Sequence, residues 1–95
     1  MTTETLSKQE IIGLRARAHH LHPVVMVGPK GLTEAVIRET NTALAAHELI
    51  KVSVADDDRS ERALVYKSLC LAVGAQPVQH IGKLLVLYRK RSEQK

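Results

Sequence analysis

Aromatic side chains are almost absent from this sequence, whose 95 residues include two tyrosines, no phenylalanine and no tryptophan. A core built from this chain must therefore be aliphatic. Many proteins that read single-stranded RNA stack its bases on aromatic rings, as RRM sheets and aromatic-lined grooves do. The composition therefore counts against both of these platforms.

Cysteine is equally scarce: Cys70 stands alone, which excludes an internal disulfide framework. Cys70 lies in an apolar helical pattern, where we expect a small buried side chain rather than a nucleophile. No apolar run approaches the roughly 20 residues of a membrane span, and the first residues lack the apolar core of a signal peptide. We expect a cytoplasmic protein with no membrane partner.

Catalytic motifs are missing as well, since the chain has no Gly-x-Ser-x-Gly, no Walker loop and no dinucleotide fingerprint. His19, His20 and His22 have no Cys or acidic residue nearby in sequence, so we interpret them as solvated or RNA-facing rather than as metal ligands. The acidic run 56–58 lacks the spacing of a calcium loop, and we expect a helix-capping turn rather than a magnesium site. We expect no enzymatic activity, metal, cofactor or small-molecule substrate.

The chain does have an excess of positive charge: 14 Lys and Arg against 10 Asp and Glu give a formal net charge of +4. Residues 83–95 hold five Lys or Arg and one Asp or Glu, an excess equal to the whole net charge. This balance is consistent with a polyanionic partner. The Arg89-Lys90-Arg91 tail is either a solvated chain end or a nucleic-acid contact.

The first half of the chain predicts a helix, a strand and a second helix. A capping box over residues 7–10 begins the first helix, which ends near His20 because Pro23 disfavours helix before it. On this helix Lys8, Arg15 and His19 share one flank. Residues 24–27 are a β-branched run typical of a buried strand. Thr33 caps a second helix that runs to about His47, and its inward positions are Val36, Thr40, Ala43, Leu44 and His47.

The second half predicts a strand, a helix and a hairpin. Residues 49–55 alternate as a half-buried strand, with Lys51 and Ser53 on the polar face. The third helix starts at the acidic run and ends at Gly74, but it is apolar nearly all round, so its register is open. Strands 76–81 and 84–88 flank Gly82-Lys83, which suits a type II′ turn.

The element order α-β-α-β-α-β-β predicts a single compact α/β domain. The strand–helix–strand unit over residues 24–55 should be a right-handed crossover between parallel strands. The hairpin adds antiparallel pairing, so we expect a mixed four-stranded sheet with the helices packed against it.

The segment from strand to helix at residues 27–33 contains Gly28-Pro29-Lys30-Gly31. Glycines allow a tight turn and a close approach of a ligand backbone, and the following helix start offers amide groups. Lys30 adds a positive charge at the tip. A Gly-x-x-Gly pattern also occurs in plain structural turns, so both a structural turn and a phosphate site stay open on the motif alone.

Three segments together resemble the CRM domain, a name that stands for chloroplast RNA splicing and ribosome maturation. They are PVVMVGPKGLTEAV (residues 23–36), LIKV (49–52) and IGKLLVLYR (81–89). The chain is similar to the stand-alone bacterial, YhbY-type form. The resemblance covers about residues 7–91, and we expect one CRM-like domain over residues 1–95 with a short basic tail. It implies a fold similar to the C-terminal domain of translation initiation factor three.

The resemblance also implies RNA binding and association with precursors of the large ribosomal subunit. The family's Gly-x-x-Gly loop maps onto Gly28, Pro29, Lys30 and Gly31. Its basic surface beside that loop maps onto Lys8, Arg15, Lys51 and Arg89. His22 departs from the pattern, because a lysine is expected there before the proline.

A second class of function is a protein-interaction or dimerisation module. On the last strand, Leu85 and Leu87 lie on one face, and Leu84, Val86 and Tyr88 on the other. An uncovered face could bind a partner or a second copy. RNA binding should weaken steeply as salt rises, whereas an apolar interface should not.

Overall fold

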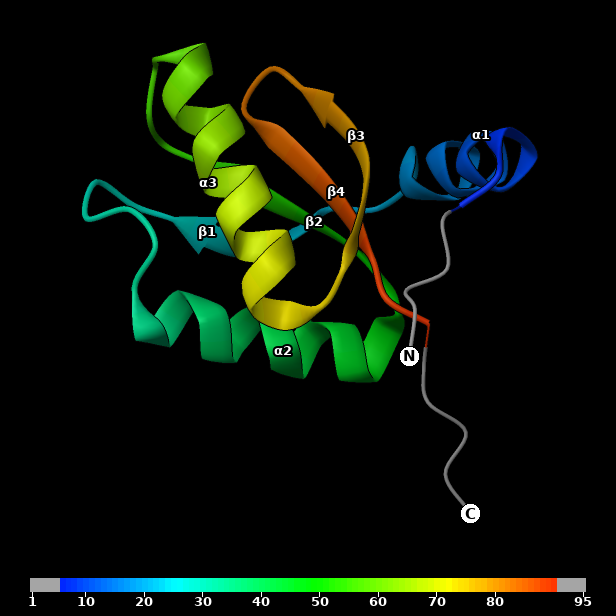
Figure 1. Cartoon of the computed structure of the whole chain (residues 1–95), viewed down its shortest axis with the longest axis horizontal. Helices are drawn as coiled ribbons and strands as arrows, with labels where there is room; N and C mark the ends of the chain where they lie inside the picture. The colour runs from blue at the N-terminus through cyan, green and yellow to red at the C-terminus, as the bar shows by residue number, and fades with distance from the viewer. Residues whose placement is uncertain (1–5, 91–95) are drawn as a thin grey trace.

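The computed structural model describes residues 6–90, which form three helices and a four-stranded sheet (Figure 1). The helices are α1 (Lys8–Ala18), α2 (Glu34–His47) and α3 (Arg59–Val73), and the strands are β1 (Pro23–Val27), β2 (Leu49–Val54), β3 (Gln76–Ile81) and β4 (Leu84–Tyr88). The element order and the single α/β domain predicted from the sequence are confirmed. Within residues 6–90, no helix is long and apolar enough to span a bilayer. Arg91 of the predicted basic tail lies outside the described residues.

Each helix begins at a side-chain cap. In α1, Ser7 Oγ accepts from the Glu10 amide at 3.1 Å, and Glu10 Oε1 accepts from the Ser7 amide at 2.8 Å. Thr33 caps α2, and Asp58 Oδ1 accepts from two amides at the start of α3. Gly74 ends α3 in the left-handed conformation, with φ of 67°. The predicted caps are confirmed, although α1 ends at Ala18, before the predicted residue 20.

The sheet has the strand order β1-β2-β4-β3, with β1 parallel to β2 and the other pairs antiparallel. The predicted mixed sheet is therefore confirmed, and β1 and β3 are its edges. In the hairpin, Gly82 has φ of 54° and Lys83 has no positive φ, as a type II′ turn requires. Pro77 lies on the edge strand β3, where its missing N–H costs least.

The two faces of the sheet are covered differently. Helices α2 and α3 pack on one face, where the larger core cluster includes Val27, Leu44, Val52 and Leu69. Helix α1 covers part of the other face with a smaller cluster around Leu14 and Val86, which we call the α1 cluster.

The cover on each face and the strand order correct two expectations about the strands. β2 is predicted to be half-buried but is covered on both faces, and Lys51 on its expected polar face is only 9% exposed. β1 is predicted to be buried, yet as an edge strand it leaves Val24 and Met26 55% and 68% exposed.

Tyr66 joins α3 to an irregularity in β3. The β3–β4 register shifts between Pro77 and Gln79, which leaves amides of β3 outside the regular ladder. The amides of Val78 and Gln79 donate to the Tyr66 hydroxyl at 2.9 and 3.2 Å, and the hydroxyl donates to the Val86 carbonyl. Burial raises the pKa of Tyr66 to about 12. One buried hydroxyl therefore provides hydrogen-bond partners for the backbone groups that the register shift leaves unpaired.

The register of α3, open from the sequence, is settled by the packing. Leu69, Cys70 and Val73 face the core, whereas Leu64 and Leu71 are 58% and 75% exposed. The helix is therefore apolar on its solvent side as well, which explains why periodicity alone does not define its inner face.

Candidate nucleic-acid interface

Residues 28–31 form a tight turn between β1 and α2. The Gly31 amide donates to the Gly28 carbonyl at 2.9 Å, which places Pro29 and Lys30 at the two corners. Gly31 has φ of 76°, whereas Gly28 has no positive φ, so the backbone demands glycine only at Gly31. A Cβ at either glycine would meet no atom within 4 Å. The space beside the turn is therefore open to a ligand.

Lys30 is the main donor that this turn offers. Its side chain is exposed, and its amide makes no hydrogen bond within residues 6–90. Pro29 has no N–H, and the Gly31 amide is used inside the turn. The start of α2 attracts an anion only weakly. Thr33 Oγ1 already accepts from an amide there, and Glu34 places a carboxylate in the first turn. Attraction for a phosphate therefore comes mainly from Lys30.

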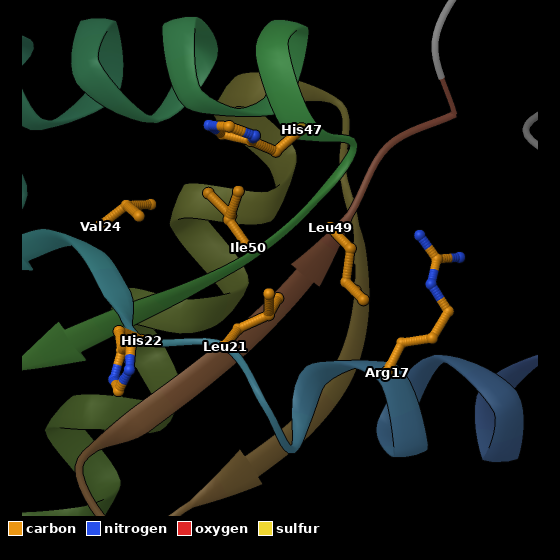
Figure 2. A pocket seen from close by; sticks show the side chains of 7 residues that line it. All are labelled: Arg17, Leu21, His22, Val24, His47, Leu49 and Ile50. Carbon is orange, nitrogen blue, oxygen red and sulfur yellow. The ribbon is translucent and has the colours of Figure 1, made fainter.

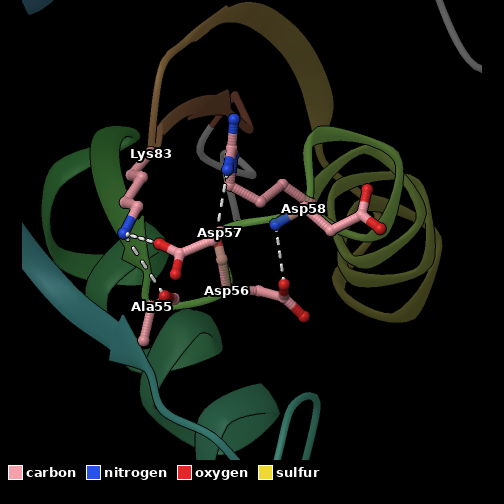
Figure 3. Close-up of polar contacts among 6 residues, drawn as sticks. Ala55, Asp56, Asp57, Asp58 and Lys83 are labelled. Atoms are coloured by element: carbon pink, nitrogen blue, oxygen red, sulfur yellow. Dashed lines mark hydrogen bonds and ion pairs between the residues drawn. The ribbon is translucent and has the colours of Figure 1, made fainter.

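One side of the turn is acidic. A groove of about 310 Å³ beside it is also lined by Asp56 and Asp57 of the β2–α3 connection. Lys83, at the hairpin tip, donates to Asp57 Oδ1 at 2.5 Å and to the Ala55 carbonyl at 3.5 Å (Figure 3). Its hydrogen bond and charge hold the pKa of the exposed Asp57 carboxyl below the ordinary value. A phosphate is therefore better accepted from the β1 side of Lys30.

The acidic run 56–58 and the histidines carry side chains that can ligate metal ions. Within the described chain, no group of three or more His, Cys, Asp or Glu side chains is arranged to hold a metal ion. The run instead pairs with Lys83 and caps α3.

Two of the predicted cations, Lys8 and Arg15, are exposed on α1. Arg15 Nε donates to the Val78 carbonyl at 3.2 Å and so also ties α1 to β3. In Figure 1, α1 and the connection from β1 to α2 lie at opposite ends of the molecule. The structure therefore does not gather Lys8 and Arg15 beside the turn.

The other two predicted cations already have partners within the protein: Lys51 is buried, and Arg89 is partly buried. Lys51 Nζ donates to the carbonyl of Leu21, in the connection that follows α1, at 3.1 Å, and Lys51 is buried. Arg89 Nη1 donates to Asn41 Oδ1 at 2.7 Å and to the Val73 carbonyl at 2.8 Å, which ties the end of β4 to α2 and α3. Lys51 therefore does not belong to the exposed basic surface, and the guanidinium of Arg89 is held by its contacts with α2 and α3.

A second hollow, of about 410 Å³, lies between the C-terminal ends of α1 and α2 and opens where β1 begins. We call it the α1–α2 cleft. It is lined by four apolar and three nitrogen-bearing side chains: Leu21, Val24, Leu49, Ile50, Arg17, His22 and His47. Figure 2 shows His47 on one side of Ile50, with His22 and Arg17 on the other.

This cleft corrects the expectation that His47 points inward, because His47 is exposed and lies at the rim. The sequence patterns do not single out Arg17 as a site residue. It stands three residues after Leu14 and four before Leu21, however, and so borders the inner face of its helix. A bulge between Pro23 and Val25 falls at Val24 and places that side chain against the cleft. No local pattern predicts that the ends of two helices meet there.

Cys70 is buried in the larger core cluster, as predicted. Burial raises the pKa of its thiol to about 11. The thiolate is therefore disfavoured near neutral pH, and Cys70 is a core residue rather than a nucleophile.

These observations define a small α/β domain that presents a lysine-tipped Gly-x-x-Gly turn between a strand and a helix. The profile of the CRS1 / YhbY (CRM) domain matches residues 6–89. The chain belongs to this family, and the resemblance seen in the sequence is confirmed.

Relatives of similar length share this domain. The chain is 48% identical over 91 residues to a protein of Haemophilus influenzae named "RNA-binding protein", covering 96% of this chain and 92% of the relative. It is 40% identical over 82 residues to "Probable RNA-binding protein YqeI" of Bacillus subtilis, covering 86% and 85%. The solution structure of the hypothetical protein SAV1595 from Staphylococcus aureus superposes with a TM-score of 0.84 at 31% identity, covering 96% of this chain and 95% of that one.

Proposed function

We propose that this protein is a non-enzymatic RNA-binding protein of ribosome assembly that captures backbone phosphates at the 28–31 turn. Its family and the names of its relatives support RNA binding. The observation that carries the site is Lys30, whose exposed ammonium and unpaired amide stand on a turn with open space beside both glycines. Lys8 and Arg15 on α1 offer further charges to a longer RNA.

The mechanism suits a structured RNA. Double-stranded RNA is recognised largely through its shape, phosphates and 2′-hydroxyls, which need no aromatic platform. Phosphate contacts position a protein on its partner but carry no sequence information. We therefore expect binding to structured RNA with little sequence preference and with a clear loss of affinity as salt rises.

Lys30→Ala tests the turn. The variant removes one exposed charge and no core contact, so the free energy of unfolding should change by about 0.5 kcal/mol or less. Affinity should fall alike for unrelated RNA hairpins, and the slope of log affinity against log salt should shrink by roughly one. Fluorescence anisotropy with two or more hairpins at several salt concentrations measures both.

The matched control for this test is Lys67→Ala, which removes one exposed charge from α3. It should leave affinity and salt slope near their wild-type values. Wild-type affinity and slope in a folded Lys30→Ala protein would show that the turn is only structural.

A role in ribosome assembly predicts that the protein is bound to ribosomal particles in cell extracts. The protein should sediment with large ribosomal subunits or their precursors on sucrose gradients, and its deletion should perturb the subunit profile. Protein found only in the free fraction, with normal profiles after deletion, would contradict this role while leaving RNA binding itself untouched.

A protein-interaction surface is a second candidate, on the part of the Leu84 face of the sheet that the α1 cluster leaves uncovered. Leu85 and Leu87 are covered by the larger cluster, and Val86 and Tyr88 belong to the α1 cluster. The part of the sheet beyond α1 instead exposes a row across all four strands, paired in register: Met26, Ser53, Leu84 and Ile81. Two of them, Met26 and Ile81, are 68% and 48% exposed. Self-association by this row would persist at high salt, whereas RNA binding would not.

A further inference from the structure

The α1–α2 cleft combines an apolar floor with a flat, basic rim. The guanidinium of Arg17 and the imidazoles of His22 and His47 are planar groups of the kind that stack on nucleobases. No Asp or Glu is among the lining residues. The volume of about 410 Å³ falls within the range of roughly 300–1,000 Å³ typical of small-ligand sites. The cleft therefore suits a flat ring with a negative charge close by.

The two tyrosines of the chain are poorly placed to stack on a base. Tyr66 is 8% exposed and holds the β3 bulge, and Tyr88 packs in the α1 cluster. His22 and His47, by contrast, are exposed, and both are among the residues that line the cleft (Figure 2). His19 and His20 are also exposed, but they contact each other edge to face and do not line the cleft, whereas His22 and His47 line it together with Arg17.

The edge strand β1 connects the cleft to the 28–31 turn. From Val24 to Gly28 the strand advances about 13 Å at 3.3 Å per residue, which is the length of a few nucleotides. Val24 and Met26 project along this path with more than half of each side chain exposed. Because the other side of the turn faces Asp56 and Asp57, charge directs a bound strand along β1 toward the cleft.

We propose that the α1–α2 cleft holds one unpaired nucleotide of an RNA whose adjoining backbone is bound at the 28–31 turn. This inference rests on the proposed RNA binding and gives the cleft a separate role in it. The base packs on the apolar floor beside the imidazole of His47, and the guanidinium of Arg17 meets the phosphate of this same nucleotide, a contact that a fully paired stem does not make. Every base has a stacking face, so the cleft selects an unpaired nucleotide without selecting its identity.

The experiment uses the full chain and three RNA hairpins with the same stem. One stem is fully paired, the second carries a single bulged nucleotide, and the third carries the same bulge without its base. We expect the wild type to bind the bulged hairpin roughly fivefold more tightly than the paired one, at the lower end of measured stacking contributions. The abasic bulge should bind like the paired stem, because bending at a bulge is not what the cleft recognises.

Two variants place this preference in the cleft. Arg17→Ala and His47→Ala should bring the ratio of bulged to paired affinity close to one, and both residues are exposed, so the fold should survive. Lys67→Ala, a charge control remote from the cleft, should keep the ratio. Lys30→Ala should weaken both hairpins equally and also keep it.

The outcomes separate the two proposals. If the wild type binds none of the hairpins, the proposed RNA-binding function fails. If it binds the paired and bulged hairpins equally, or if both folded cleft variants keep the wild-type ratio, RNA binding stands and the cleft proposal is overturned. An abasic bulge bound as tightly as the intact one likewise overturns it.

Discussion

Replacing Tyr66 with phenylalanine is expected to lower the free energy of unfolding by about 2–4 kcal/mol. The variant keeps the ring in the core but removes the hydroxyl that serves the amides of Val78 and Gln79 and the carbonyl of Val86. Buried backbone groups without a partner cost roughly 1–3 kcal/mol each, and at a bulge no ladder bond replaces the loss. Urea titration measures the effect, and the melting temperature should fall by roughly 10–25 °C.

Tyr88→Phe is the matched control for this loss. Tyr88 is half-buried, and its hydroxyl makes no hydrogen bond among the described residues, so removing it should change stability by less than about 0.5 kcal/mol. The amides of Val78 and Gln79 should exchange faster in Tyr66→Phe than the rest of the sheet. Equal stability of the two variants would mean that the bulge does not depend on the hydroxyl.

Gly31→Asp should reduce RNA affinity at least tenfold relative to Gly31→Asn. Both substitutions meet the same positive φ of 76°, and neither Cβ has an atom within 4 Å, so the two variants share any backbone strain. They differ by one negative charge where a phosphate is expected to approach Lys30. Like charges placed together at an interface cost several kcal/mol, which supports an effect of this size.

Anisotropy titrations of one hairpin at two salt concentrations would measure the difference, which should narrow as salt screens the added charge. Thermal melts of both variants provide the folding control. If the Asp and Asn variants fold alike and bind RNA with the same affinity, phosphates do not approach the turn.

Much of the fold is predictable because its signals are local. The capping box at Ser7, the cap at Thr33 and the stop at Gly74 each depend on residues within one helical turn. The two-residue hairpin loop at Gly82-Lys83 likewise fixes the pairing of its own strands. Element order then constrains the topology, since a strand–helix–strand unit has one favoured handedness.

Burial is harder to predict from the sequence, because it depends on which distant element covers each face of a strand. Alternation along β2 indicates one polar face, but Leu49 on that face packs against α1, and Lys51 is buried with its ammonium on the Leu21 carbonyl. The β-branched run in β1 indicates a buried strand, but its place at the sheet edge leaves it half open. Neither position is encoded within the segment itself.

The candidate site divides in the same way. The 28–31 turn follows from four consecutive residues, and its predicted shape is present. Whether a cation faces solvent depends on remote partners, and Arg89 finds two of them in Asn41 and Val73. The α1–α2 cleft needs two helix ends and a strand bulge to coincide in space, so no sequence window contains it.

The position of β4 has a consequence for how the chain reaches its native state. β4 is the last strand along the chain, yet it lies between β2 and β3 and pairs with both. Until residues 84–88 are in place, β2 has one open edge and β3 has no partner in the sheet. Sheet formation must therefore wait for contacts between segments distant in sequence. Such contacts slow folding, because the entropy of closing the intervening loop is lost before the contacts stabilise the chain. We therefore expect the sheet to be completed at its middle, when β4 pairs with β2 and joins the two edge strands into one sheet.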